Sequence, residues 1–334
     1  MAAEAESSRR NRVERFFSKI GTAWQMAGLT ILFLIIIDLL AGAAVWTFSA
    51  GHNIERLELR MYQGAPWAPE LLQEWGQFRL RWHPYTYYRS RPMKSPYINI
   101  GADGIRKTWN HGLTGAPAPG SKPIKVFMFG GSTMLGQYDR DDYTIPSMLV
   151  KDLKAREISG VQVTNFGQIG YESGREAIAL WDEIRRGNIP DLVIFYDGAN
   201  DTISAYQEGV AGNPQNEANR EREFSMNARY SAGRRALYYN AAAFVASSWL
   251  GQLATAGMER FAYRTFFPHT IGNTPRGPVL AGEVVRLYLA NLKLVDIMGG
   301  SFGFRALYYW QPVIYSRKHL SPLEHEWIPI THDQ

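Results

Sequence analysis

Three short segments hold the residues that could carry out chemistry, and each follows a run of apolar residues. Ser132 comes after two glycines that end the run IKVFMF, which begins at Ile124. A serine at the carboxyl end of a strand lies where an open α/β sheet places its reactive groups. The glycines let the backbone turn tightly and leave the hydroxyl group uncovered. Taken alone, the segment is more typical of a glycine turn with a serine helix cap.

Two further segments favour the reactive interpretation of Ser132. Residues 165–170 (NFGQIG) follow the run VQVTNF, and residues 197–201 (DGAND) follow the run DLVIFY. Parallel strands end at one edge of a sheet, so the three loops are expected on the same side. A serine, a glycine loop and a Gly-x-Asn-Asp segment in this order resemble the first three sequence blocks of the SGNH (GDSL) hydrolases.

The resemblance implies roles for three residues. Ser132 corresponds to the nucleophile of the family, while its own N–H group, the N–H group of Gly167 and the side-chain amide of Asn200 correspond to the oxyanion hole. Such donors stabilise the negative oxygen of a tetrahedral intermediate. Asp197 and Asp201 are interpreted as turn and helix-capping residues, and a capping role for Asn200 also stays open.

The family's fourth block, a C-terminal Asp-x-x-His that supplies the general base, is not found. The late histidines are His319, His325 and His332, and three positions before them stand Ser316, Pro322 and Pro329. A serine without a base is a poor nucleophile at neutral pH. His332, with Asp333 beside it, is retained as a remote candidate base, and His269 as a more remote one. If Gln334 ends a fragment, the base could lie beyond it.

The apolar runs and the segments between them predict an α/β fold. The runs IKVFMF, VQVTNF, DLVIFY and FRALYYW are typical of buried parallel strands. Residues 145–156, 173–186 and 282–298 separate them with helical periodicity. This alternation favours a parallel sheet with helices on both faces. The resemblance implies a three-layer α/β/α, flavodoxin-like sheet of the SGNH hydrolase type, preceded by one N-terminal transmembrane helix.

Composition changes along the chain predict four regions. They are a basic cytoplasmic tail at 1–25, a transmembrane helix at 26–50, a largely irregular wrapping segment at 51–122 with a short helix near 70–78, and a hydrolase-like domain at 123–334 with a helical insertion at about 204–276. Residues 239–256 of the insertion are apolar, but interspersed polar residues make a second crossing weak. An amphipathic helix that packs on the domain is favoured, and contact with the membrane or a partner stays open.

Residues 26–50 are long and apolar enough to cross a hydrocarbon core of about 30 Å as a helix. Arginines and a lysine precede this stretch, whereas acidic and basic residues are mixed after it. The positive-inside rule therefore puts the N-terminus in the cytoplasm and the main domain outside the inner membrane of a bacterial-type cell, in the periplasm or beyond. A cleaved signal peptide is the alternative.

Asp38 lies near the middle of this stretch, where an unpaired carboxylate costs at least a few kcal/mol. Either Asp38 makes a polar contact with another membrane helix, or it is protonated and tolerated by apolar neighbours. The first alternative implies membrane protein partners near Asp38, in addition to the lipid bilayer around residues 26–50.

The totals exclude several classes of function. A formal net charge of +5 without a basic stripe does not indicate nucleic-acid binding. The chain has no cysteine, which excludes disulfides, thiolate catalysis and cysteine-based metal sites. No metal-ligand cluster is recognisable and no cofactor is expected.

Two functions remain after these exclusions. The missing base, together with Asp38, favours an inactive or impaired SGNH hydrolase-like subunit that serves as an accessory or scaffold in a membrane complex. The alternative is an active serine esterase or O-acyl transferase that acts on envelope carbohydrate or lipid esters through an acyl-Ser132 intermediate.

Overall fold

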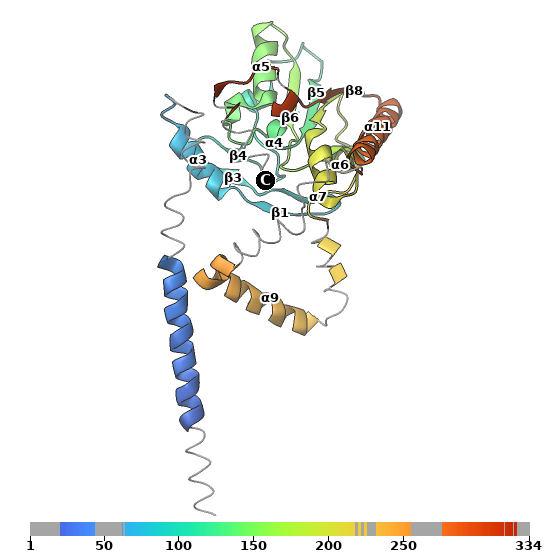
Figure 1. Cartoon of the computed structure of the whole chain (residues 1–334). Coiled ribbons are helices and arrows are strands. Elements are labelled where there is room, and N and C mark those ends of the chain that lie inside the picture. The colour runs from blue at the N-terminus through green and yellow to red at the C-terminus, as the bar shows by residue number, and fades with distance from the viewer. Residues whose placement is uncertain are drawn as a thin grey trace, which may run out of the picture. The chain divides into compact units, whose positions relative to one another are not determined.

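The computed structural model describes residues 21–43, 62, 64–217, 220–221, 224–225, 232–254, 276–316, 318–322 and 324–325. The chain divides into two compact units (Figure 1). One unit takes in residues 57–224 and 268–334, and the other takes in residues 1–56 and 225–267.

The larger unit is built on a parallel sheet of four strands. The strands are β5 (Ile124–Gly130), β6 (Val161–Asn165), β7 (Leu192–Asp197) and β8 (Arg305–Trp310), in the order β6-β5-β7-β8. All neighbouring pairs are parallel. The four strands predicted from the apolar runs and the α/β class are therefore confirmed. In the register, Met128 pairs with Asn165 and Gly130 with Tyr196, so the three strands that precede the polar loops end side by side.

Helices connect the strands and cover both faces of the sheet (Figure 1). They are α4 (Ser132–Leu135), α5 (Ile145–Ala155), α6 (Ser173–Arg185), α7 (Ala199–Glu208) and α11 (Arg276–Phe302). Helix α5 begins where the Thr144 side chain accepts a hydrogen bond from the N–H group of Ser147, a capping arrangement that favours helix initiation. The helix predicted over 282–298 is present and longer at both ends.

Side chains alternate between the two faces of the sheet along each strand, and an apolar core lies on each face. Phe127 and Phe129 face α6 and α11, where they pack with residues such as Leu180. Val126 and Met128 face the opposite way and pack against α5. Because successive side chains of a strand point to opposite faces, an apolar stretch such as Val126–Phe129 suits a sheet that is covered on both sides.

The segment before β5 contains more regular structure than its sequence predicts. It forms α3 (Ala68–Gln77), the antiparallel pairs β1 (Leu80–His83) with β2 (Tyr87–Ser90) and β3 (Met93–Lys94) with β4 (Asn99–Ile100), and the 3-10 helix η1 (Trp109–Gly112). Strands of two to four residues are too short to show a periodic pattern. Arg106 and Leu113 of this segment make antiparallel bridges to β6 and cover that edge of the sheet.

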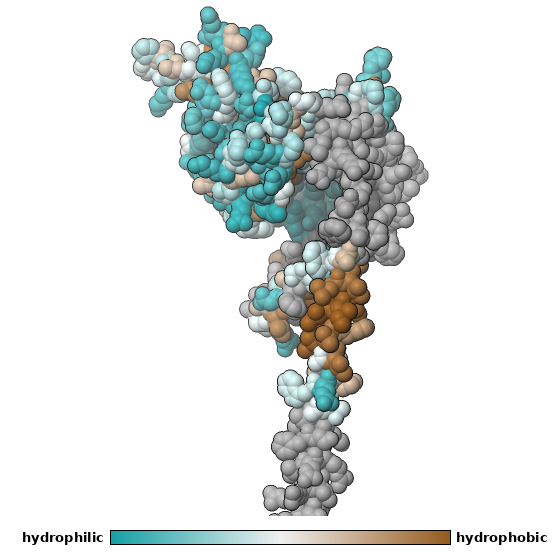
Figure 2. Space-filling view, turned by 90° about the vertical axis from the view of Figure 1, so that its left-hand side faces the viewer, coloured by the Kyte–Doolittle hydropathy of each residue, from teal (hydrophilic) through white to brown (hydrophobic). Residues whose placement is uncertain are grey.

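The smaller unit contains two described helical regions. The helix Gly21–Ala43 is the one helix among the described residues that is long and apolar enough to cross a membrane, and it is also consistent with a signal sequence. Its side chains form a continuous hydrophobic surface (Figure 2). Helix α9 (Ala232–Ser247) belongs to the same unit. The expectation that the insertion packs on the α/β domain stays a prediction.

Phe129 gives a test of the core. Its ring is fully buried and stacks with those of Phe166 and Phe195, at centroid distances of 4.8 and 5.4 Å. We expect Phe129→Ala to lower the free energy of unfolding by about 3–5 kcal/mol. Urea unfolding of the full chain in detergent, followed by tryptophan fluorescence, measures the change. Ile124→Ala, at the 52% exposed start of the same strand, is the control and should cost about 1 kcal/mol or less. Equal losses would contradict this description of the core.

Candidate active site at the ends of β5 and β7

Ser132 lies at the point where the sheet topology changes direction. The connection after β5 leads to β6 on one side, and the connection after β6 leads to β7 on the other. In open α/β sheets, the crevice outside the strand ends at such a switch point is where ligands bind. Ser132 is the first residue of α4, directly after β5, and its side chain is partly exposed. The expected position of Ser132 at the carboxyl end of a strand is therefore observed.

Asn200 lies beside the turn that presents Ser132. A Cβ atom added to Gly131 would come within 2.1 Å of Asn200 Nδ2, so only glycine fits at this position. The amide of Asn200 donates one hydrogen bond to the carbonyl oxygen of Tyr171, at 2.6 Å. An amide nitrogen carries two hydrogens, and the second is available to another acceptor near Ser132.

The three expected oxyanion-hole donors differ in whether they already donate a hydrogen bond within the protein. The N–H group of Ser132 has no acceptor within the described part of the chain. The N–H group of Gly167 donates to Asn165 Oδ1 at 2.9 Å, and is therefore already used. Gly167 is packed so closely that an added Cβ atom would lie 2.3 Å from the N atom of Leu135. Two of the three donors, those of Ser132 and Asn200, thus have free capacity.

The structure brings no described histidine to Ser132. Among the described residues are His83, His111, His319 and His325, and none of them hydrogen-bonds Ser132 Oγ. His83 instead pairs with Thr86 Oγ1 at 3.0 Å. The candidate bases His332 and His269 lie outside the described residues, and their role as a base stays a prediction.

No family model matches the sequence, and no curated protein matches it.

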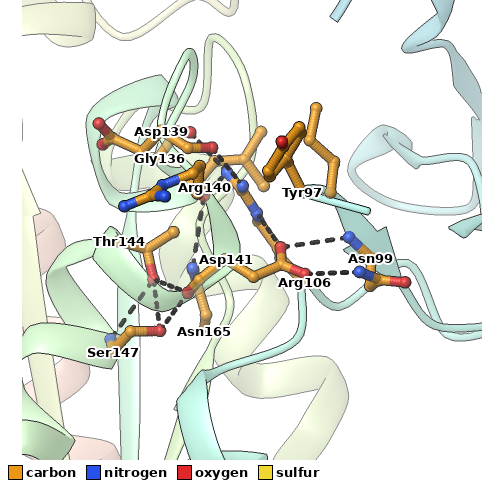
Figure 3. Close-up of polar contacts among 12 residues, drawn as sticks. Tyr97, Asn99, Arg106, Gly136, Asp139, Arg140, Asp141, Thr144, Ser147 and Asn165 are labelled. Carbon is orange, nitrogen blue, oxygen red and sulfur yellow. Dashed lines mark hydrogen bonds and ion pairs between the residues drawn. The ribbon is translucent and has the colours of Figure 1, made fainter. Parts of the chain in front are cut away.

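Arg106 fixes the loop that follows the Ser132 turn (Figure 3). Its guanidinium group is buried and donates to the carbonyl oxygens of Leu135, Gly136 and Asp139. Its Nε also donates to Asp141 Oδ1 at 2.9 Å. Burial lowers the pKa of Arg106, and the Asp141 carboxylate opposes that shift. The chain that leaves Ser132 is therefore held by one side chain from the wrapping segment.

Asp141 extends this network to the wrapping segment. Its carboxylate accepts hydrogen bonds from both the backbone N–H and the side-chain amide of Asn99, at 3.1 and 2.8 Å (Figure 3). Its carbonyl oxygen accepts from the hydroxyl group of Ser147 in α5. Sequence reasoning missed this network, because a single arginine in an irregular segment gives no sign that it is buried.

A second group of ionisable residues lies at the end of β7 and in the helices α6 and α11. Asp197 accepts a hydrogen bond from the hydroxyl group of Tyr288 in α11, at 2.7 Å, and burial raises the pKa of Asp197 to about 6. Burial and the nearby carboxylates of Asp197 and Asp201 raise the pKa of Glu176 well above its ordinary value. No donor in the described chain reaches either carboxyl oxygen of Glu176. Burial of these two oxygens without a donor disfavours the charged carboxylate, which is the main cause of the raised pKa of Glu176.

Asp201 has a capping role, as the sequence suggested. Its carboxylate accepts hydrogen bonds from the N–H and hydroxyl groups of Ser173, the first residue of α6. Asp197, by contrast, is a buried strand residue rather than a turn residue. No group of three or more His, Cys, Asp or Glu residues in the described chain is arranged to hold a metal ion.

Asp38, in the smaller unit, makes a polar contact within the chain, and a contact with another membrane protein stays a prediction. Its Oδ1 accepts a hydrogen bond from the backbone N–H group of Leu250, at 2.7 Å. The donor belongs to the insertion of the same chain.

The Arg106 network can be tested by substitution. Arg106→Met leaves the Asp141 carboxylate and three carbonyl oxygens without this donor, and breaking a buried pair in this way costs about 3–5 kcal/mol. We expect a loss of that size in urea unfolding of the full chain. The matched control is Arg156→Met, because Arg156 pairs with Asp152 at 2.8 Å on the surface. That exposed pair should contribute less than about 1 kcal/mol. A loss for Arg106→Met no greater than for the control would show that the network does not hold the loop.

The raised pKa of Asp197 predicts an unusual pH dependence. In the unfolded chain an aspartate loses its proton near pH 4, whereas in the folded protein Asp197 keeps it up to about pH 6. The folded state thus binds more protons in this window, so stability falls as the pH rises from about 4 to above 6. The loss is on the order of 3 kcal/mol. Asp197→Asn should remove much of this slope in urea midpoints measured against pH, while Asp191→Asn at the exposed start of the same strand should keep it. An unchanged slope in Asp197→Asn would contradict the assignment.

Proposed function

We propose that this chain is a membrane-anchored SGNH hydrolase-like protein with an inactive or strongly impaired Ser132 site. We further propose that it serves as an accessory subunit of a membrane complex on the periplasmic side of a bacterial inner membrane. One observation carries the proposal: no imidazole group of the described residues hydrogen-bonds Ser132 Oγ. A general base alone contributes about 10²–10⁴ to the rate of such reactions.

The topology supports an SGNH-type domain. Counted along the chain, the strand order β6-β5-β7-β8 corresponds to 2-1-3-4, the order of a flavodoxin-like sheet. The serine, the glycine loop and the Asn200 segment follow the three adjacent strands β5, β6 and β7. Occupation of the Gly167 N–H group by Asn165 supports an impaired oxyanion hole.

The anchoring part of the proposal rests on the apolar helix and its flanks. The helix Gly21–Ala43 is preceded by a basic tail, which favours a cytoplasmic N-terminus and a periplasmic main domain. The contact between Asp38 and Leu250 supports retention of the helix, because a cleaved signal peptide would take Asp38 away from its partner.

An active serine esterase or O-acyl transferase is the second candidate. The specific observation in its favour is the geometry around Ser132, which is partly exposed and has the Asn200 amide against the preceding glycine. In this case the substrate would be an envelope carbohydrate or lipid ester, and an acyl group would be carried on Ser132 Oγ.

Ester turnover separates the two candidates. We expect the full chain in detergent to hydrolyse p-nitrophenyl acetate only a few-fold faster than Ser132→Ala. Added imidazole should raise the rate of the wild type above that of Ser132→Ala, because it supplies the missing base to a site that keeps the N–H donors of Ser132 and Asn200. Ser121→Ala removes an exposed serine hydroxyl elsewhere and should behave as the wild type.

A different outcome would favour the second candidate. Turnover that exceeds that of Ser132→Ala by orders of magnitude without imidazole would show that the chain has its own base. Purification of the protein in mild detergent as a lone monomer would contradict the accessory role.

A further inference from the structure

The backbone around residue 250 is hydrogen-bonded to Asp38, which lies five residues before the end of the apolar helix Gly21–Ala43. The helix that ends at Ser247 is interrupted at Ser248 and resumes over residues 249–254. Such an interruption leaves N–H groups without intrahelical partners. Two acceptors satisfy them: Ser248 Oγ accepts from Gly251 N–H at 3.0 Å, and Asp38 Oδ1 accepts from Leu250 N–H at 2.7 Å.

Side-chain packing supports the same contact. A Cβ atom added to Gly42, one helical turn after Asp38, would lie 2.9 Å from the ring of Trp249. Ala41 is buried, although most residues of its helix are exposed. The indole ring thus lies directly against the small residues of the N-terminal helix.

We propose that residues 232–254 are embedded in the lipid bilayer beside the N-terminal helix, as a segment that enters and leaves the membrane on the same side. The inference rests on the membrane anchoring proposed above and adds a second membrane element to it. Asp38 lies about 25 Å along the helix from Gly21, at a rise of about 1.5 Å per residue, and so within the hydrocarbon layer when the helix spans it. Leu250 must lie at the same depth, because its N–H group contacts the carboxylate of Asp38.

The exposed side chains of α9 change from charged to aromatic to apolar along the helix, as expected for a helix that enters the hydrocarbon from the membrane surface. Arg234 lies in the first turn, Tyr238 and Tyr239 follow one turn later, and Val245 lies near the end. Arginine is suited to phosphate headgroups, tyrosine to the interface and valine to the acyl chains. The exposed apolar side chains of Leu250 and Leu253 continue this series.

The connectivity determines how the segment returns. The chain leaves the α/β unit at Phe224 and re-enters it at Pro268, so both ends of the insertion lead to the same folded unit. A helix that crossed the bilayer once would put these ends on opposite sides. Irregular backbone at membrane depth needs internal hydrogen-bond partners, and Asp38 supplies one of them at the break.

Spin labels on the full chain test this proposal directly. The protein has no cysteine, so single cysteines can be introduced at Leu253 and Val245 and labelled with a nitroxide. The control is Ile158→Cys, at an exposed apolar position of the α/β unit. In phosphatidylethanolamine–phosphatidylglycerol vesicles, we expect the labels at 245 and 253 to collide with oxygen and to be shielded several-fold from a water-soluble nickel complex. The label at 158 should be open to the nickel complex.

Two results would overturn the lipid contact. Nickel accessibility at 245 and 253 equal to that at 158 would place the segment in water. Shielding from both oxygen and nickel would place it against protein, such as a second copy of the chain.

The role of Asp38 has its own test in the Leu253-labelled protein. We expect Asp38→Ala to expose the label to nickel, because the break in the helix loses an acceptor. Asp38→Asn keeps an acceptor oxygen and should preserve the shielding. If Asp38→Ala leaves the shielding unchanged, Asp38 does not hold the segment in the membrane.

Discussion

The buried guanidinium group of Arg106 connects the parts on which the candidate site depends. It comes from a segment that precedes the sheet, and it binds the carbonyl oxygens of the loop that follows Ser132. Through Asp141 it also joins this loop to β4 and α5. Backbone carbonyl groups in a tight buried loop need donors, and here Nη1 and Nη2 of one side chain supply them. The position of the serine therefore depends on residues that are distant in the sequence.

Buried carboxyl groups at the end of β7 are the second feature of the candidate site, besides the Arg106 network. Asp197 and Glu176 are both buried, and burial raises the pKa of each. Tyr288 completes the group from α11, on the face of the sheet that α6 also covers. Asn200 follows Asp197 by three residues, in the first turn of α7. The asparagine amide beside Gly131 therefore lies close in the chain to these buried carboxyl groups.

The strands and most helices could be predicted because their signals are local. Apolar runs such as those that contain Phe129 and Phe195 need only the next few residues to be recognised, and the loops after them follow from topology. Arg106 and Tyr288 could not be predicted in the same way, because burial of a polar side chain depends on partners more than thirty residues away. The short strands β1 to β4 were missed because two to four residues carry no period. The hydrogen bond between Asp38 and Leu250 could not be predicted either, because its donor is a backbone N–H group 212 residues away.

The contact between Asp38 and Leu250 joins residues that are 212 positions apart, and this separation has a consequence for biosynthesis. The N-terminal helix leaves the ribosome first, and about 5–20 residues are added per second. Asp38 is therefore synthesised roughly 10–40 s before its partner Leu250. Strands β5, β6 and β7 are made during that interval. The smaller unit is thus completed only after three strands of the sheet have been made, although its N-terminal helix is made first.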